Sequence, residues 1–223
     1  MMGKSNEEDI ELSDYLDTYF NKNEKFVVDN IINISEKDGA KDHLVLILES
    51  PHRIELINKR PLMGSSGKSA ANALGYDGTK ALGEIASEGK DISIINLSTL
   101  PLDPDGVISN FGEEDNTKYK CYIEYFEDNP KVANAINSAR KSSRKDIVAY
   151  FVKRNSDIVQ KLQNPNKELD IYACGIFAGK VADGLFKDKK ISFTKILHPS
   201  YSQWIETEET QNTIKFIDKH KKK

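Results

Sequence analysis

The strongest constraint on the fold is a short apolar run that ends in a polar turn. Leu44 to Leu48 is an unbroken stretch of Leu, Val and Ile, too short for a buried helix and typical of a strand buried on both faces of a parallel sheet. Three further segments, less uniformly apolar, also have strand patterns, at residues 92–97, 169–174 and 192–197. Helical patterns separate these runs, so the sequence predicts a three-layer α/β/α domain with a mainly parallel four-stranded sheet.

The length and the regions outside the strands bound the domain organisation. A chain of 223 residues is long enough for one domain with a proper core, and we expect a single domain over 1–223. Apolar residues between 8 and 34 recur at helical spacing, which predicts one or two amphipathic helices in an N-terminal extension over 1–40. Residues 101–130 are acidic and rich in turn formers, and they predict an irregular surface excursion within an insertion at about 103–145.

Further helices are expected on the same grounds of spacing and capping. One begins near Ser66 and breaks between Gly75 and Gly78; others cover 131–163, follow Gly175 and end the chain. The dense basic run at 140–145 interrupts the long helical pattern and is typical of a solvated loop or of a phosphate contact.

Composition excludes several function classes. A net charge of −3 and a sequence pI near 5.9 argue against a protein that coats nucleic acid through bulk electrostatics, so any DNA contact has to be focused. Only Cys121 and Cys174 occur, which predicts neither a disulfide framework nor a CxxC metal site, and favours a reduced, cytoplasmic setting. The acidic start has no apolar core segment and no stretch is long enough to span a bilayer, so we expect no membrane association.

Polar residues follow the predicted strands at the places where ligands bind in open α/β sheets. Glu49 and His52 follow the first strand, Asn96 lies near the end of the second, and His198 follows the fourth. The crevice beyond the carboxyl ends of parallel strands is the usual ligand site, and an amide that both donates and accepts suits the edge of a planar ring. The alternative is structural: a polar turn at the first strand, a turn cap for the amide, and a capping imidazole.

Residues 60–69 carry a glycine- and serine-rich loop that resembles a phosphate-binding P-loop superficially. That motif needs a glycine where this chain has Leu62, and it follows its strand at once, whereas a long linker intervenes here. Backbone N–H groups at the start of the next helix can still face a phosphate or a base edge. Nucleotide hydrolysis at Ser65 to Ser69 therefore stays a third, less favoured alternative.

Several separated stretches, in order, resemble motifs of the uracil-DNA glycosylase superfamily, most closely its single-domain iron-sulfur type. LESPH at 48–52 resembles the GEAPG turn, and RPLMGSSGKSAANAL at 60–74 resembles the RPFVG loop and its helix. IINLSTLP at 94–101 resembles the strand that ends in Asn, YACGIFAGKVA at 172–182 the LG-x-x-A corner, and LHPSYSQW at 197–204 the HPS loop. The resemblance covers most of residues 44–204.

The resemblance implies base excision, in which a uracil or another deaminated base leaves the DNA stack, enters a pocket and is cleaved from its sugar by water. It implies that Glu49 polarises water or opposes positive charge on the sugar. Asn96 would hydrogen-bond the pyrimidine edge, and His198 would face the carbonyl oxygen of the departing base. It also implies that the segment from Ser200 to Trp204 presses into the duplex. The implied substrate-binding residues are Ser50, Pro51, His52, Leu62, Gly64, Ser65, Pro199, Ser200 and Tyr201.

Departures from the family pattern leave a second function open. Leu62 replaces a phenylalanine that stacks on the base, Ser50 stands where other members carry a catalytic aspartate, and His52 replaces a small glycine. Two cysteines cannot hold a four-thiolate cluster, so we expect no iron-sulfur group or other cofactor. The alternative to a glycosylase is a non-catalytic module of the same fold that binds a nucleobase, a nucleotide or modified DNA. We expect either to act as a monomer.

Overall fold

The computed structural model describes residues 6–34, 43–142, 145–163, 169–200, 204 and 211–222. Within them, four strands form one parallel sheet in the order β2-β1-β3-β4. Their bounds are His43–Leu48 (β1), Ile92–Asn96 (β2), Leu169–Cys174 (β3) and Thr194–Ile196 (β4). Every residue of β1 is buried, as a continuous apolar sequence requires in the middle of a parallel sheet. The predicted fold class is confirmed.

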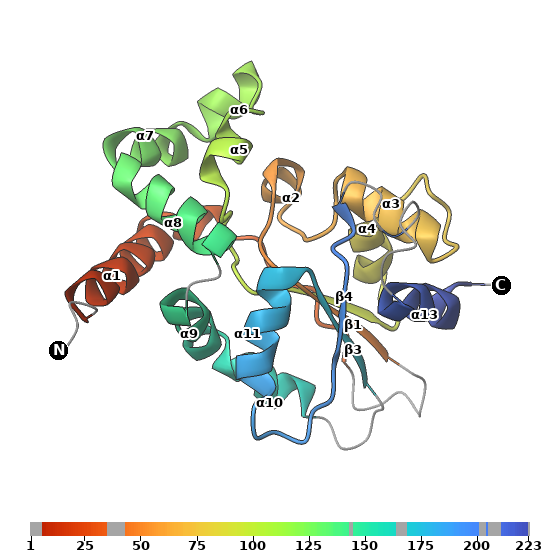
Figure 1. Cartoon of the computed structure of the whole chain (residues 1–223). Helices are drawn as coiled ribbons and strands as arrows, with labels where there is room; N and C mark the ends of the chain where they lie inside the picture. The colour runs from red at the N-terminus through yellow and green to blue at the C-terminus, as the bar shows by residue number, and fades with distance from the viewer. Residues whose placement is uncertain are drawn as a thin grey trace.

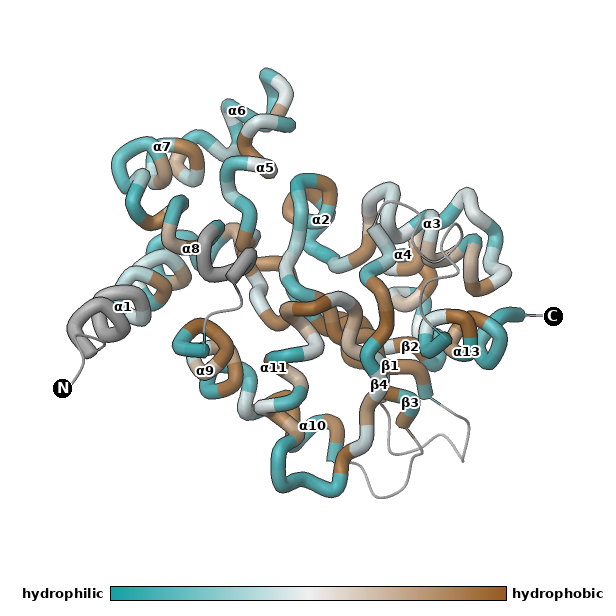
Figure 2. The backbone as a smooth tube through the Cα atoms, viewed as in Figure 1, coloured by the Kyte–Doolittle hydropathy of each residue, from teal (hydrophilic) through white to brown (hydrophobic). Residues whose placement is uncertain are grey.

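Helices cover both faces of the sheet, as Figure 1 shows, and each face has its own hydrophobic core. One core joins the strands to α1 (Asn6–Lys22), α7 (Lys120–Asp128), α8 (Pro130–Ser142), α9 (Lys145–Arg154), α10 (Ser156–Leu162) and α11 (Ile176–Phe186). The other joins them to α3 (Ser65–Ala73), α4 (Leu82–Ser87) and α13 (Gln211–His220). The strands are mostly brown in Figure 2, so the most hydrophobic part of the chain lies between these two helical layers.

The N-terminal region is only partly helical. After α1 and a short 3-10 helix, η1 (Glu24–Phe26), residues 27–34 run beside β2. Ile31 exchanges two backbone hydrogen bonds with Ile94, at 2.9 and 2.8 Å, in an antiparallel bridge. The predicted helix through 26–32 is therefore wrong, because the open edge of β2 offers this backbone hydrogen-bond partners outside its own segment.

The acidic stretch after β2 is helical, so the predicted irregular excursion at 101–130 is also wrong. It forms α5 (Pro104–Ile108), α6 (Glu113–Lys118) and α7. Its turn residues are helix caps: the Asp103 side chain accepts the Gly106 N–H at 3.3 Å, and Pro104 begins α5. Tyr119, Tyr122 and Phe126 are buried, which holds this short-helix segment against the core.

The helices after β1 begin and end close to their predicted positions, with one addition. The chain leaves β1 through α2 (Arg53–Asn58), which the sequence pattern did not predict, and then forms α3 and α4 on either side of the expected break. The helix that begins after Gly175 is confirmed as α11 and the final helix as α13. In Figure 1 the β4 arrow points toward the end of the sheet at which α2 lies, so the carboxyl ends of the strands meet there.

Candidate functional site

A cavity of about 1070 Å³ opens at the carboxyl end of the sheet. Its walls come from the ends of β1 and β3, the first turns of α2 and α3, α5, the start of α11, and the segment after β4. The lining residues are Leu48, Glu49, Ser50, His52, Arg53, Ile54, Glu55, Leu62, Gly64, Ser65, Ser66, Ser69, Asp103, Gly106, Asn110, Cys174, Gly175, Ile176, Phe177, Leu197, His198 and Ser200. This is the position at which parallel α/β sheets bind their ligands.

The turn after β1 supplies one wall of the cavity. Glu49 lies at the strand end, and its backbone carbonyl accepts the N–H of Ser98 at 2.9 Å, which extends the pairing with the neighbouring strand. The buried Ser50 hydroxyl accepts the Leu102 N–H at 3.2 Å, so this side chain ties the turn to the start of the insertion. His52 precedes α2 and is exposed. Two hydrogen bonds therefore fix the turn, one through the Glu49 carbonyl and one through the Ser50 hydroxyl.

Glu55 is a cavity residue that the sequence interpretation missed. Its side chain is only 7 % exposed, and its two carboxylate oxygens accept the backbone N–H of His52 at 2.6 Å and of Leu62 at 2.5 Å. Burial raises the pKa of this carboxyl to about 7, although both hydrogen bonds oppose the shift. One buried carboxylate thus joins the turn after β1 to the loop at 60–64.

The loop at 60–64 supplies the next wall of the cavity, and contacts with α3 and α4 fix the position of its backbone. Leu62 lines the cavity, is 2 % exposed, and has a left-handed backbone with φ at 50°, which is uncommon for a leucine. Its carbonyl accepts the Gly83 N–H at 3.1 Å. A Cβ at Gly67 would lie 1.8 Å from that same carbonyl oxygen, so α3 needs a glycine there for the loop to pass. The aliphatic side chain of Leu62 is consequently a fixed part of the wall.

His198 lines the same cavity, and its contacts with Ser200 define its tautomer. Ser200 donates its backbone N–H to His198 Nδ1 at 3.2 Å, and its Oγ lies 2.9 Å from the same nitrogen. Because a backbone N–H can only donate, Nδ1 accepts, and the neutral imidazole carries its proton on Nε2. Gly175, at φ 91°, lets the start of α11 pass close to the ring, since a Cβ there would lie 3.4 Å from His198 Cβ.

Asn96 reaches the predicted strand end but does not line the cavity. Its side chain is 1 % exposed, and neither its Oδ1 nor its Nδ2 has a hydrogen-bond partner among the described residues. Its backbone N–H is bound by Asn30 Oδ1 at 2.8 Å. Asn96 pairs with Leu48 in the strand register, so its amide lies one strand away from a lining residue.

The remaining predicted residues fall into three groups. Ser50, His52, Leu62, Gly64, Ser65 and Ser200 line the cavity together with Glu49 and His198, whereas Pro51 and Pro199 are buried beside it without lining it. Tyr201 lies outside the described residues. Trp204 is 4 % exposed, donates its indole N–H to the Leu197 carbonyl at 2.8 Å and packs on Phe216. The Trp204 ring therefore belongs to the core, while residues 201–203 lie outside the described residues, so the expected contact of the segment from Ser200 to Trp204 with DNA stays a prediction for the rest of that segment.

An ion pair connects the cavity to the helical insertion. The Arg53 guanidinium, on the cavity wall, contacts the Asp115 carboxylate, and its Nε donates to that group at 2.9 Å. Asp115 also accepts the Gly112 N–H at the start of α6, at 3.3 Å. The Arg53 guanidinium holds the pKa of Asp115 below its usual range. The insertion is thus fastened to the rim of the cavity.

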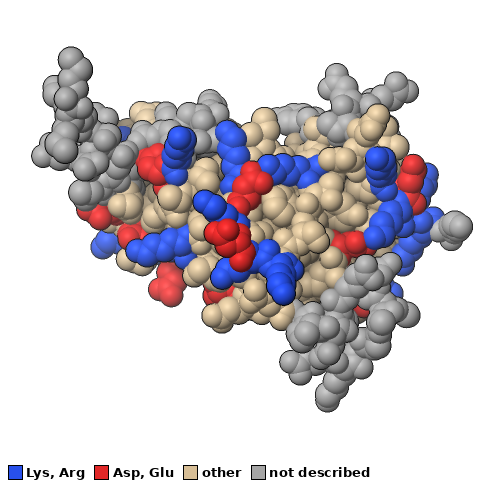
Figure 3. Space-filling view, turned by 60° about the horizontal axis from the view of Figure 1, so that its bottom comes forward, with Lys and Arg blue, Asp and Glu red and all other residues tan. Residues whose placement is uncertain are grey.

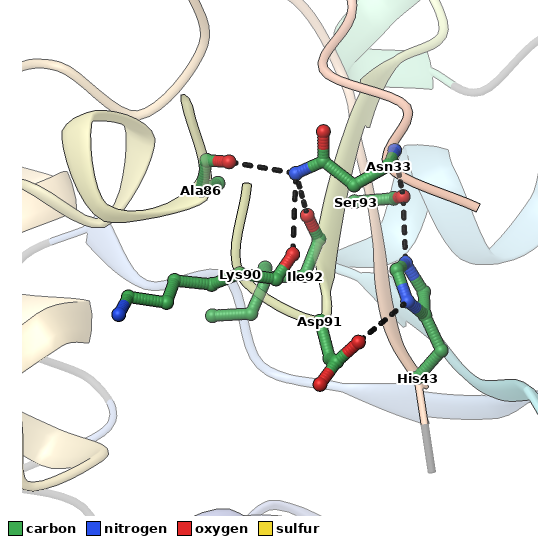
Figure 4. A network of polar contacts seen from close by, with 7 residues as sticks. All are labelled: Asn33, His43, Ala86, Lys90, Asp91, Ile92 and Ser93. Carbon is green, nitrogen blue, oxygen red and sulfur yellow. Dashed lines mark hydrogen bonds and ion pairs between the residues drawn. The ribbon is translucent and has the colours of Figure 1, made fainter. Parts of the chain in front are cut away.

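A second polar cluster lies at the opposite, amino end of the strands and has the composition of a catalytic triad. Figure 4 shows His43 between Ser93 and Asp91, with Nε2 2.8 Å from the Ser93 hydroxyl and Nδ1 3.9 Å from the Asp91 carboxylate. His43 and Ser93 are fully buried, and the Ser93 oxygen also accepts the Asn33 N–H at 2.9 Å. Asn33 Nδ2 donates to the carbonyls of Ala86 and Ile92. Because the hydroxyl and the imidazole are buried within the described residues, we interpret the cluster as a structural link between residues 31–34 and β2.

The described residues contain no group of three or more His, Cys, Asp or Glu side chains placed to hold a metal ion. Across the same part of the chain, no helix combines the length and the apolar character needed to cross a membrane. Figure 3 shows a face on which basic and acidic side chains are interspersed, with no continuous basic surface.

No protein-family model matches this chain, and no match was found among the curated proteins or among the solved structures.

Proposed function

We propose that this protein is an N-glycosylase that removes a deaminated or otherwise modified base, such as uracil, from DNA. The observation that carries the proposal is that Glu49 and His198, which follow the first and last strands, line one cavity at the carboxyl end of the sheet. A carboxylate can oppose positive charge on the sugar and an imidazole can donate to the leaving base, so this pair on one cavity suits hydrolysis of a base–sugar bond. The resemblance of the strand-end motifs to uracil-DNA glycosylases supports the same reaction.

The proposed reaction separates charge between sugar and base. As the glycosidic bond breaks, positive charge gathers on the sugar and negative charge on the oxygen of the base. The Glu49 carboxylate opposes the first charge and polarises the attacking water, and the Nε2–H of His198 donates to the second. The contact between Ser200 and Nδ1 maintains the required tautomer. Leu62 supplies an aliphatic wall where a base can pack by its face.

A specific observation favours a second candidate, a binding module without turnover. Asn96 does not line the cavity, and Leu62 offers no aromatic ring for stacking, a contact typically worth about 1–3 kcal/mol per base. The cavity volume of about 1070 Å³ is at the upper end of ordinary small-molecule sites and accommodates a nucleobase or a nucleotide in either case. The two candidates share a ligand and differ in chemistry.

The deciding experiment measures base release from single- and double-stranded oligonucleotides that each contain one uracil, hypoxanthine or xanthine. Abasic sites are revealed by alkaline strand cleavage under single-turnover conditions. We expect wild-type protein to release at least one of these bases, and His198→Ala and Glu49→Gln each to lower the rate about 10²- to 10³-fold.

Glu88→Gln, on the exposed end of α4, is the matched carboxylate control and should leave the rate unchanged. Full activity in both cavity variants would refute the proposed mechanism. If free uracil or free hypoxanthine raises the melting temperature of the wild type while no base is released from the oligonucleotides, the protein is a binding module without turnover.

A further inference from the structure

Two side chains near the cavity have every polar atom buried and no hydrogen-bond partner within the part of the chain that the structure describes. They are Asn96, with its Oδ1 and Nδ2, and Ser69, with its Oγ. An unpaired buried polar group typically costs about 1–3 kcal/mol of stability, and such groups in native proteins call for a specific explanation.

The two side chains lie on the same side of the sheet. Asn96 follows Ile94 by two residues and pairs with Leu48, so its side chain points to the face that α3 and α4 cover. Ser69 lies on α3 and lines the cavity together with Leu48 and Leu62. The unpaired amide and the unpaired hydroxyl therefore lie on the same side of the sheet, and of the two only Ser69 lines the cavity.

The Ser69 hydroxyl has no structural task that explains its presence. Serine inside a helix commonly donates to the carbonyl four residues earlier, as Ser87 does in α4, where its Oγ lies 2.7 Å from the Gly83 carbonyl. Ser69 makes no such bond. Its neighbours Ala70, Ala71 and Ala73 are buried, so an alanine would suit the position sterically and would be the better helix former.

We propose that Ser69 determines specificity by hydrogen-bonding the polar edge of the heterocycle that enters the cavity. This inference rests on the proposed function, in either its catalytic or its binding form. A hydroxyl donates and accepts, and it turns about χ1 between neighbouring positions, so it can follow either a ring N–H or a ring carbonyl. The ligand class is a planar base that presents a carbonyl oxygen beside a ring N–H.

The test compares Ser69→Ala with Ser87→Ala in the full chain, using two measurements. Thermal unfolding is recorded with and without free uracil or free hypoxanthine, and base release is measured on the oligonucleotides described above. We expect Ser69→Ala to melt at or above the wild-type temperature while its affinity for the base and its rate of release fall about tenfold. Ser87→Ala should melt lower and keep both functions, because it loses a satisfied bond remote from the cavity lining.

Each other result has a defined meaning. If Ser69→Ala melts lower and binds and releases bases as the wild type does, Ser69 is structural and the inference is wrong. If the wild type releases bases and Ser69→Ala does so equally well, the inference fails while the glycosylase stands. If binding of the free base depends on Ser69 and no base is ever released, the inference stands and the glycosylase fails. A wild type that neither binds nor releases a base overturns both.

Discussion

Glu55 shows how a single residue sets the shape of this cavity. Both of its carboxylate oxygens are occupied by backbone N–H groups from two different segments, and burial raises its pKa to about 7. In the unfolded chain the same carboxyl titrates near 4.5. The folded protein therefore holds this proton more tightly than the unfolded chain does, so stability from this group is present below about pH 4.5 and is lost as the pH rises through 7.

Replacing Glu55 by Gln should make the free energy of unfolding less dependent on pH over this range. Between pH 5 and pH 7.5 the free energy of unfolding of the wild type is expected to fall by about 2 kcal/mol through this carboxyl, and that of Glu55→Gln by much less. Urea unfolding at a series of pH values measures the difference. Glu88→Gln serves as the exposed control and should follow the wild-type curve over this range, whereas parallel curves for wild type and Glu55→Gln would contradict the assignment.

The cavity residues that could be predicted from the sequence are those that directly follow the end of a strand. Glu49 and His198 line the cavity because parallel strands bring their carboxyl ends together, and the sequence shows where the strands end. Asn96 occupies an equivalent strand end, yet what covers its side chain depends on α3 and α4, which the strand sequence does not specify. Glu55 did carry a signal, since it follows His52 by three residues, the spacing of a capping box.

At the scale of elements, the loop at 60–64 is wedged between two helices by contacts that leave no room for a side chain. Gly67 on α3 and Gly83 on α4 face its backbone, where a Cβ would meet the carbonyl oxygens of Leu62 at 1.8 Å and Pro61 at 2.0 Å. The position of this cavity wall therefore depends on two glycines, neither of which lies within the loop.

Gly67→Ala should consequently damage both stability and function. The added methyl group has to displace the loop backbone, and overpacking of this kind typically costs about 1–3 kcal/mol. Thermal unfolding should show a clear drop in melting temperature, with weaker binding of bases at temperatures where the variant remains folded. Gly78→Ala is the control, because its Cβ would meet Asn72 at an ordinary 3.6 Å, and equal stability of the two variants would show that the loop tolerates displacement.

Elements were predictable where one local pattern dominates. The four strands and α3, α4, α11 and α13 follow from apolar runs, spacing and glycine breaks. The segment 27–34 has helical spacing and nevertheless pairs with β2, because backbone hydrogen bonds to a strand edge outweigh a short periodic pattern. In the insertion, Asp103, Pro104 and Gly112 were interpreted as turn residues, whereas they mark helix starts, for which the same residue types are used.

At the scale of the whole molecule, the charge distribution bears on the proposed binding of DNA, which would have to be focused. The net charge is −3, and on the face shown in Figure 3 basic side chains alternate with acidic ones. Around the cavity, Arg53 lies on the wall, and Arg60 and Lys68 are exposed on the adjoining loop and on α3. In the proposed function, such a surface would suit contacts with a few phosphates near a flipped base.

Binding of DNA should therefore depend only moderately on salt. With about three phosphates neutralised, the logarithm of the association constant should fall against the logarithm of salt concentration with a slope near −3. Fluorescence anisotropy with a labelled duplex containing the released base measures this slope. A slope near −10 would mean an extended basic footprint and would contradict a focused contact.

The bridge between Ile31 and Ile94 has a consequence for the behaviour of the sheet in a crowded solution. A free outer strand is a template on which a second chain can add its own backbone, the first step toward aggregation. Here residues 28–33 occupy that side of β2, through backbone bonds at Val28 and Ile31 and through the Asn30 and Asn33 contacts. On the other side, β4 is only three residues long. Among the residues that the structure describes, both edges of the sheet are therefore short or occupied, which leaves another copy of the chain no long strand edge to extend there.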